Sequence, residues 1–208
     1  LLAVTSTEMD EAQISMRISL HNIKFAKSKL LCSSPPKKKY PDIEYVSIEP
    51  LKSVDMYNRM IFQDLHKYFE TSHCLIVQAD SFVVNSDLWK DEFLKYDYIG
   101  GPWPNKIEVK PDLILNLEKN TVGNGGFSLR SRKLVEATSK INFQSLNFPM
   151  KAEDVVICHY LYQKMIDNGI RFAPPELAAQ FSMENIENLY GQNVNSVFGF
   201  HGKHMRKF

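Results

Sequence analysis

The stretch Cys74-Leu75-Ile76-Val77-Gln78-Ala79-Asp80 decides the fold that this sequence predicts. A short run of large apolar residues is typical of a buried strand, and this run ends at a carboxylate. Open α/β sheets bind their ligands beyond the carboxyl ends of their strands. If the protein has an active site, we therefore expect Asp80 to lie in it. Considered alone, Asp80 is more simply interpreted as a strand-end aspartate that bonds its own backbone.

The composition is that of one globular domain, which we expect to span residues 1–208. Of the 208 residues, 44% are hydrophobic and 12% aromatic, so the chain can bury a substantial core. The formal net charge of +1 gives no reason to expect nucleic acid as a partner. The cysteines are odd in number and far apart, which predicts buried thiols and no disulfide framework or thiolate metal site: Cys32, Cys74 and Cys158.

No stretch of the sequence approaches the roughly 20 apolar residues that cross a bilayer. Residues 1–4 are too short, and lack the basic flank, for a signal peptide. We therefore expect a cytoplasmic protein.

The first hundred residues alternate predicted strands and helices. Short apolar or branched runs predict strands at residues 1–4, 30–32, 42–48 and 74–80. An apolar stripe at helical spacing predicts a helix that Thr7 would cap, and Ser53 begins a second helix. This order is typical of a mostly parallel sheet covered by helices. We expect about residues 1–100 to form a Rossmann-like half.

The second half of the chain contains two glycine-rich segments. Residues 96–104 combine aromatic residues with Gly and Pro, which predicts a loop that presents apolar surface. Gly123-Asn124-Gly125-Gly126 precedes a predicted strand at residues 127–130. Glu153 and Asp154 begin a predicted helix that Asn168-Gly169 ends.

Each of these features also has a purely structural interpretation. The glycine cluster has no dinucleotide or P-loop spacing, so it is either a tight turn or a place where backbone approaches a ligand closely. Acidic residues such as Glu153 and Asp154 are favoured in the first turn of any helix. Trp103 alone is more often a packing residue, and His201 alone is more often a packed or exposed histidine than a metal ligand.

Taken together, these segments resemble the four common motifs of the GT-A type glycosyltransferases. The segments Gln78-Ala79-Asp80, Gly123–Gly126, Ala152-Glu153-Asp154 and His201 correspond to the D-x-D, glycine-rich loop, x-E-D and C-terminal histidine motifs. The sequence is most similar to a small, poorly characterised family of predicted glycosyltransferases. The blocks that carry this second resemblance are Q-x-D, Y-D-Y-I-G-x-P-W, V-G-N-G-G-F-S-L-R-S, E-D-V and F-G-F-H-G.

The resemblance implies one α/β GT-A-like domain with a mixed central sheet flanked by helices. It divides the chain into a nucleotide-binding half at about residues 1–100 and an acceptor-binding, catalytic half at about residues 101–208. It further implies transfer of a sugar from a nucleotide-diphosphate sugar, expected to be a UDP-sugar, to a hydroxyl of a carbohydrate or glycolipid. A lipid-linked acceptor in polysaccharide synthesis would bring the enzyme to the inner face of a membrane.

The resemblance also assigns roles to individual residues. Asp80 and His201 would bind Mn²⁺ or Mg²⁺, which stabilises the leaving diphosphate. Asp154, with Glu153 second, would be the general base of an inverting reaction, whereas a retaining reaction would not need one. The donor would contact residues spread over the chain: Thr5, Gln78, Asp80, Trp103, Asn124, Gly125, Gly126 and Lys203.

The sequence departs from the family pattern at two positions. Gln78 replaces the first acid of the D-x-D, and Ser81 stands where the close family has glycine. The missing carboxylate leaves two other functions open. One is a metal-dependent sugar-phosphate nucleotidyltransferase, although residues 5–8 lack the basic glycine-rich loop which that reaction needs. The other is a non-catalytic glycan-binding or scaffold domain.

Overall fold

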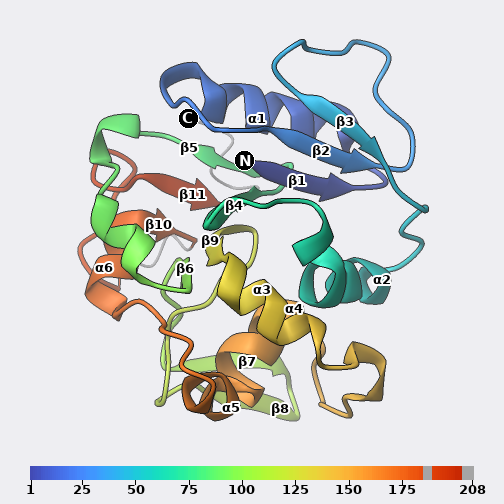
Figure 1. The fold of residues 1–208 in the computed structure, drawn as a ribbon. Coiled ribbons are helices and arrows are strands. Elements are labelled where there is room, and N and C mark those ends of the chain that lie inside the picture. The colour runs from blue at the N-terminus through green and yellow to red at the C-terminus, as the bar shows by residue number, and fades with distance from the viewer. Residues whose placement is uncertain (185–188, 203–208) are drawn as a thin grey trace.

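A six-stranded mixed sheet forms the centre of the molecule (Figure 1). The computed structural model describes residues 1–184 and 189–202. The strand order is β3 (Glu44–Ser47), β2 (Lys29–Cys32), β1 (Leu2–Thr5), β4 (His73–Val77), β9 (Phe127–Ser131) and β6 (Tyr98–Gly100). The first four strands are parallel, and β9 runs antiparallel to both of its neighbours. The predicted α/β class with a mixed sheet is therefore confirmed.

Residues 74–77 of β4 are apolar without interruption because both faces of the sheet are covered. In β4, Leu75 and Val77 belong to one core cluster, whereas Cys74 and Ile76 belong to another. Successive side chains of a strand point to opposite faces, so the two clusters are the two sides of the sheet. The first cluster includes Met16 of α1 (Met9–Asn22), and the second includes Val135 of α3 (Arg132–Ser139).

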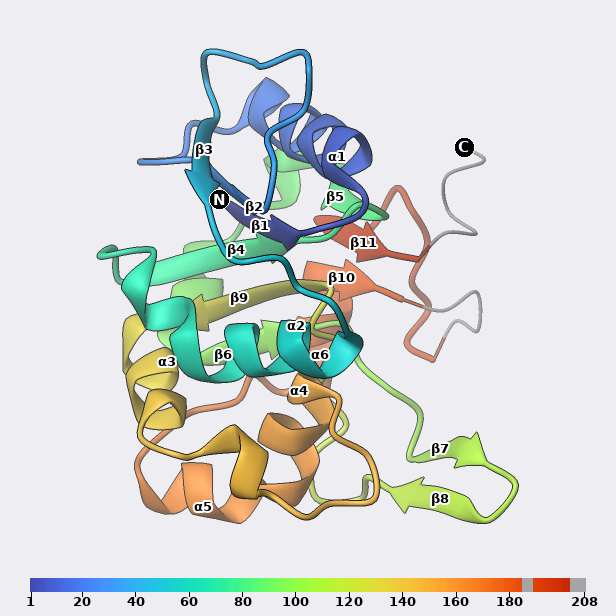
Figure 2. The same cartoon turned by 90° about the vertical axis from the view of Figure 1, so that its right-hand side faces the viewer.

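A long helical segment accompanies α3 on its side of the sheet (Figure 2). It begins at α2 (Val54–Arg59), passes through a π-helical turn, η1 (Met60–Asp64), and ends at the 3₁₀ turn η2 (Leu65–Lys67). The Ser53 hydroxyl accepts a hydrogen bond from the Met56 backbone N–H at 3.2 Å, so the predicted cap is confirmed. Ser131 caps α3 in the same way, by bonding the Leu134 N–H at 3.0 Å.

The second half of the chain adds smaller elements around this sheet. A three-stranded sheet has the order β10 (Ser182–Met183), β11 (Gly199–His201) and β5 (Ser81–Val83). Strands β7 (Lys106–Lys110) and β8 (Leu113–Asn116) form a hairpin that projects from the body (Figure 2). The remaining helices are mostly short: η3 (Ser86–Leu88), η4 (Asp91–Lys95), η5 (Phe143–Ser145), α4 (Glu153–Val155), η6 (Val156–Tyr160), α5 (Tyr162–Asp167) and α6 (Pro175–Phe181).

Three local predictions are wrong. Residues 96–104 are not all loop, because Tyr98–Gly100 pairs with β9 as the edge strand β6. Thr7 does not cap α1. Glu8 is the N-cap residue, and the Thr5 hydroxyl accepts hydrogen bonds from the backbone N–H groups of Thr7 and Glu8. Finally, β4 ends at Val77, so Gln78 and Asp80 lie in the turn between β4 and β5.

The three cysteines are free and buried, as predicted. Within residues 1–184 and 189–202, no helix has the length and apolar character needed to cross a membrane.

Candidate functional site

The candidate site lies where the carboxyl ends of β4 and β6 meet the amino end of β9. Val77 is paired with Phe127, and Gly100 is paired with Ser128. This register places the turn after β4 beside the glycine loop that precedes β9. The Gln78 backbone N–H donates to the Gly126 carbonyl at 3.1 Å, and the Ser81 hydroxyl donates to the same carbonyl at 2.6 Å. Ser81, the second departure from the family pattern, thus joins the two segments.

The small second sheet brings His201 to Asp80. Strand β11 pairs with β5 so that His201 lies opposite Ser81, and the Gly202 N–H donates to the Asp80 carbonyl at 3.0 Å. The imidazole Nε2 then lies 3.5 Å from Asp80 Oδ1 and 3.1 Å from Gln78 Oε1. Three predicted site residues therefore converge, and one of them, His201, is far from the other two in sequence.

Glu184 holds the other side of the His201 ring. His201 Nδ1 lies 3.5 Å from Glu184 Oε1, and Glu184 Oε2 accepts a hydrogen bond from the Trp103 indole N–H at 2.8 Å. Burial by itself would lower the pKa of His201. The interactions with Asp80 and Glu184 outweigh burial and raise this pKa to about 9.

Tyr57 holds the amide of Gln78. The Gln78 Nε2 group donates to the Tyr57 hydroxyl oxygen at 2.6 Å. Burial, with the nearby charge of Glu153 adding to it, raises the pKa of Tyr57 far above its usual value, so the phenol stays protonated. A chain of polar contacts thus runs from Tyr57 through Gln78 to His201.

The glycine loop needs its glycines because side chains lie directly against it. A Cβ on Gly126 would lie 2.3 Å from both Cδ2 and Nε2 of His201, and one on Gly123 would lie 2.1 Å from the Trp103 ring. Asn124 adopts a φ of +54°, and its Oδ1 accepts the Gly126 N–H at 3.0 Å. The loop is therefore fixed against the candidate metal-binding side chains.

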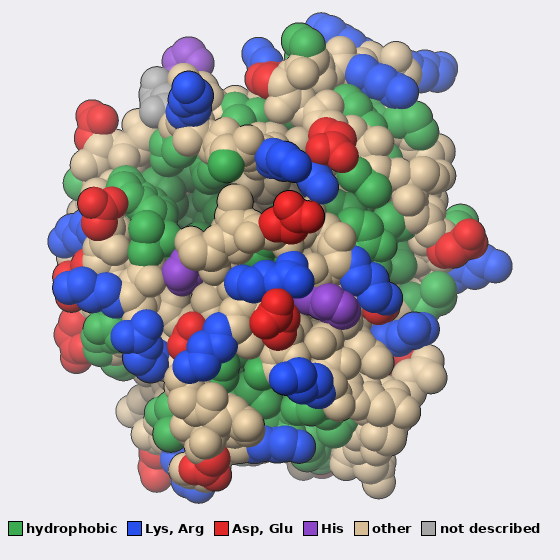
Figure 3. Space-filling model, in the orientation of Figure 1, with side chains coloured by type: hydrophobic (Ala, Val, Ile, Leu, Met, Phe, Trp, Pro, Cys, Tyr) green, Lys and Arg blue, Asp and Glu red, His purple; other side chains and the backbone are tan. Residues whose placement is uncertain are grey.

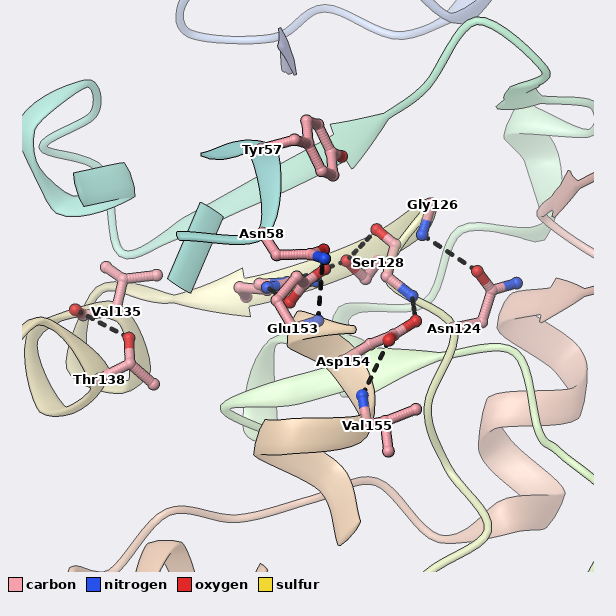
Figure 4. A network of polar contacts seen from close by, with 12 residues as sticks. Tyr57, Asn58, Asn124, Gly126, Ser128, Val135, Thr138, Glu153, Asp154 and Val155 are labelled. Atoms are coloured by element: carbon pink, nitrogen blue, oxygen red, sulfur yellow. Dashed lines mark hydrogen bonds and ion pairs between the residues drawn. The ribbon is translucent and has the colours of Figure 1, made fainter. Parts of the chain in front are cut away.

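The Asp154 side chain forms a hydrogen bond to the backbone of the same loop (Figure 4). Its Oδ2 accepts the Gly125 N–H at 2.8 Å, and its Oδ1 accepts the Val155 N–H at 2.8 Å. The side chain is only partly buried. A carboxylate offers about four lone-pair positions, so two of them remain for another donor.

Glu153 points in a different direction, into the protein. It forms a bidentate ion pair with Arg130 at 2.7 and 2.8 Å, and both side chains are almost completely buried. Burial raises the pKa of Glu153, and the contact with Arg130 opposes that rise. The Asn58 side-chain oxygen also accepts the Glu153 backbone N–H at 3.4 Å (Figure 4). Glu153 also lies against the loop, since a Cβ on Gly125 would lie 2.2 Å from its Oε1, but of the two acids it is Asp154 that accepts a hydrogen bond from the loop backbone.

The other predicted donor contacts lie around this centre in different environments. Trp103 is buried, with its ring beneath Gly123, so it presents little of the apolar surface expected of it. Thr5 ends β1 and bonds the start of α1. Lys203, like the neighbouring His204 and Arg206, lies outside the described residues.

The donors at His201 have the chemistry of a divalent cation site. Within the described residues, no group of three or more His, Cys, Asp or Glu side chains could hold a metal. Asp80 and His201 supply two such donors, and the Gln78 amide oxygen supplies a third beside them. A carboxylate, an amide oxygen and an imidazole together are ligands that Mn²⁺ accepts. The residues present therefore fit the cation.

A large apolar hollow lies elsewhere, at the amino ends of the central strands. It has a volume of about 880 Å³ and is lined by side chains that include Leu1, Phe25, Tyr68, Trp89 and Phe198. Figure 3 shows the hollow near the amino terminus, among apolar side chains. None of the candidate site residues lines it, so it is separate from the candidate site.

Sequence reasoning missed Tyr57, Glu184 and Arg130. Only Arg130 carried a local signal, because a charged residue inside a buried strand requires a partner of opposite charge. Tyr57 and Glu184 lie in segments that are ordinary in composition, and their roles depend on contacts between distant parts of the chain.

The fold is that of the GT-A glycosyltransferases. One similar solved structure is the galactosyltransferase LgtC in complex with donor and acceptor sugar analogues. It is 14% identical over 98% of this chain and 87% of that chain, with a TM-score of 0.51. Another is a glycosyltransferase involved in glycosylation of the major capsid of PBCV-1. It is 13% identical over 100% of this chain and 99% of that chain, with a TM-score of 0.50.

The chain belongs to the family DUF5672, described as a protein of unknown function, whose pattern matches residues 41–201. No curated protein matches the sequence. The expected resemblance to GT-A enzymes is thus confirmed for the fold, and the family description assigns no activity.

Proposed function

We propose that this protein is a glycosyltransferase that moves a sugar from a nucleotide-diphosphate sugar to a hydroxyl acceptor. One observation carries the proposal. Asp80, Gln78 and His201 converge beside a glycine loop held by Asp154, at the carboxyl edge of a GT-A-like sheet. Ligands of open α/β sheets bind at this edge. About residues 1–100 would bind the nucleotide, and about residues 101–208 would bind the acceptor.

Asp80 and His201 are the residues that would hold a divalent cation, for which the imidazole favours Mn²⁺ over Mg²⁺. Bound there, the cation would offset the negative charge that develops on the departing diphosphate. Gly125 and Gly126 lack side chains, so their backbone can come close to a donor. Thr5, at the end of β1, would contact the nucleotide.

Asp154 is the group that would accept the proton of the acceptor hydroxyl. As the bond from the acceptor oxygen to the anomeric carbon forms and the bond to the diphosphate oxygen breaks, this proton must leave the nucleophile. Asp154 is partly exposed, whereas Glu153 is buried and forms a bidentate ion pair with the charged Arg130. We therefore assign the base of an inverting reaction to Asp154 and not to Glu153.

The experiment is an activity screen of the purified protein with nucleotide sugars, UDP-sugars first, and a panel of carbohydrate and glycolipid acceptors, in the presence of Mn²⁺. Release of nucleoside diphosphate that disappears in Asp80→Ala supports the proposal. Production of pyrophosphate from a nucleoside triphosphate and a sugar phosphate would instead identify a nucleotidyltransferase. Glycan binding without either product would identify a non-catalytic domain.

A further inference from the structure

We propose that Gln78 is itself a ligand of the cation, through Oε1, and that Tyr57 orients it for this role. The inference rests on the proposed function and concerns how this chain manages without the first acid of the D-x-D. A glutamine at that position could equally face away from Asp80. Here its Oε1 lies 3.1 Å from His201 Nε2, which in turn lies 3.5 Å from Asp80 Oδ1.

The orientation of the Gln78 amide follows from its two partners. Both nitrogens of the His201 ring face carboxylate oxygens, Asp80 on one side and Glu184 on the other. The Gln78 amide oxygen is the atom that lies 3.1 Å from His201 Nε2. The amide NH₂ is then turned to the Tyr57 hydroxyl, which accepts its hydrogen bond at 2.6 Å. Tyr57 is thus a positioning residue.

The distances from His201 Nε2 to the Gln78 and Asp80 oxygens suit one cation. Ligands at about 2.1 Å from a metal in octahedral geometry lie about 3 Å from their neighbours. The separations of 3.1 and 3.5 Å around His201 Nε2 are close to this value. Small side-chain movements would therefore allow Gln78, Asp80 and His201 to bind the same ion.

A neutral amide in place of a carboxylate changes the charge of the site. Asp80 is then the single negative ligand from the protein, so the free protein should bind Mn²⁺ weakly. A nucleotide diphosphate brings the missing negative charge, so Mn²⁺ and UDP should each strengthen the binding of the other by the same factor. We infer that this chain takes up its cation together with the nucleotide.

The test measures binding of Mn²⁺ by electron paramagnetic resonance, with and without UDP, and needs no acceptor. In the presence of UDP, Gln78→Ala should weaken Mn²⁺ binding by at least about tenfold, and Tyr57→Phe by about tenfold, as expected for a lost ligand and a lost orienting group. Gln78→Glu should strengthen the binding of Mn²⁺ alone by about tenfold or more. Matched controls are Gln144→Glu on an exposed 3₁₀ turn and Tyr162→Phe on α5. Both should leave the affinity for Mn²⁺ unchanged, with UDP and without it.

The number of water molecules bound to Mn²⁺ shows whether Gln78 binds the ion directly or only lies near it. Electron–nuclear double resonance in ¹⁷O-labelled water should count one more water on Mn²⁺ in Gln78→Ala than in the wild type. An unchanged count together with unchanged affinity would overturn the role of Gln78, although Mn²⁺ and UDP still bound. Absence of any joint binding of Mn²⁺ and UDP to the wild type would instead overturn the proposed function.

Discussion

Arg130 of β9 and Glu153 of α4 form a bidentate ion pair, with N···O distances of 2.7 and 2.8 Å, in the interior of the protein. The pair fixes the start of α4 relative to the central sheet. Because Asp154 follows Glu153 directly, it also fixes the carboxylate that bonds the glycine loop. The buried pair is therefore a support of the candidate site, and its consequences can be measured.

The first prediction concerns stability. Arg130→Met leaves the Glu153 carboxylate buried without its partner, which should lower the free energy of unfolding by about 3 to 5 kcal/mol. Urea denaturation measures this change. As a control, Glu136→Gln breaks the exposed pair with Arg132 and should cost less than about 1 kcal/mol.

The double variant Arg130→Met with Glu153→Leu tests the cause of this loss. It removes both charges, so it should be more stable than Arg130→Met alone. If the double variant loses as much free energy of unfolding as the two single variants lose together, the loss comes from packing and not from the unpaired charge.

The second prediction concerns the glycine loop. In Gly126→Ala the new methyl group would meet the His201 ring at 2.3 Å, whereas in Gly101→Ala the nearest atom lies at 3.4 Å, an ordinary contact. We expect Gly126→Ala to weaken joint binding of Mn²⁺ and UDP by at least about tenfold, since overpacking typically costs about 1 to 3 kcal/mol. Isothermal titration calorimetry measures both variants. Equal affinities would show that the loop moves away from His201 without cost.

The sequence predicted best those elements whose pattern is local. The run that became β4, the cap Ser53 and the glycine loop before β9 are all determined by neighbouring residues. Strand β6 was missed because three residues among Gly and Pro carry no alternation to detect. Short strands such as β6 and β11 are strands only because a distant partner pairs with them.

The residues of the candidate site were likewise predicted only where neighbouring residues form a pattern. The sequence placed Asp80 near the carboxyl end of β4, although the strand ends at Val77, and its proximity to His201 was implied only by the family resemblance. Glu184 and Tyr57 were not predicted, because a glutamate after a two-residue strand and a tyrosine in a helix have no distinguishing pattern. Their functions depend on tertiary contacts with His201 and Gln78.

The third prediction concerns the base. Asp154→Asn removes proton acceptance but keeps a side-chain oxygen that can accept a backbone N–H, so the loop should stay in place. We expect kcat to fall by about 100-fold or more while the affinity for Mn²⁺ and UDP is unchanged. Steady-state kinetics and calorimetry measure the two quantities. Asp167→Asn, on the exposed face of α5, is the matched control, and full turnover in Asp154→Asn would remove Asp154 from the reaction.

The fourth prediction concerns Glu184, which lies between Trp103 and His201. In the metal-free protein, Asp80 and Glu184 raise the pKa of His201 to about 9. Glu184→Gln removes one negative neighbour, so this pKa should fall. The ring-proton chemical shift of His201, followed against pH in the presence of a chelator and assigned with His201→Asn, measures the change. Glu176→Gln, in the exposed first turn of α6, should leave it unaltered.

The same shift predicts how stability depends on pH. A pKa raised above its usual value of 6.5 means that the folded protein holds the His201 proton more tightly than the unfolded chain does. The resulting stabilisation is complete below pH 6.5 and is lost as the pH rises through about 9. The free energy of unfolding of the metal-free protein should therefore decline between pH 6.5 and about 9. This decline should be smaller in Glu184→Gln than in the wild type. An equal decline in both proteins, with an unchanged pKa of His201, would show that Glu184 supports Trp103 alone and leaves the orientation of the imidazole to Asp80.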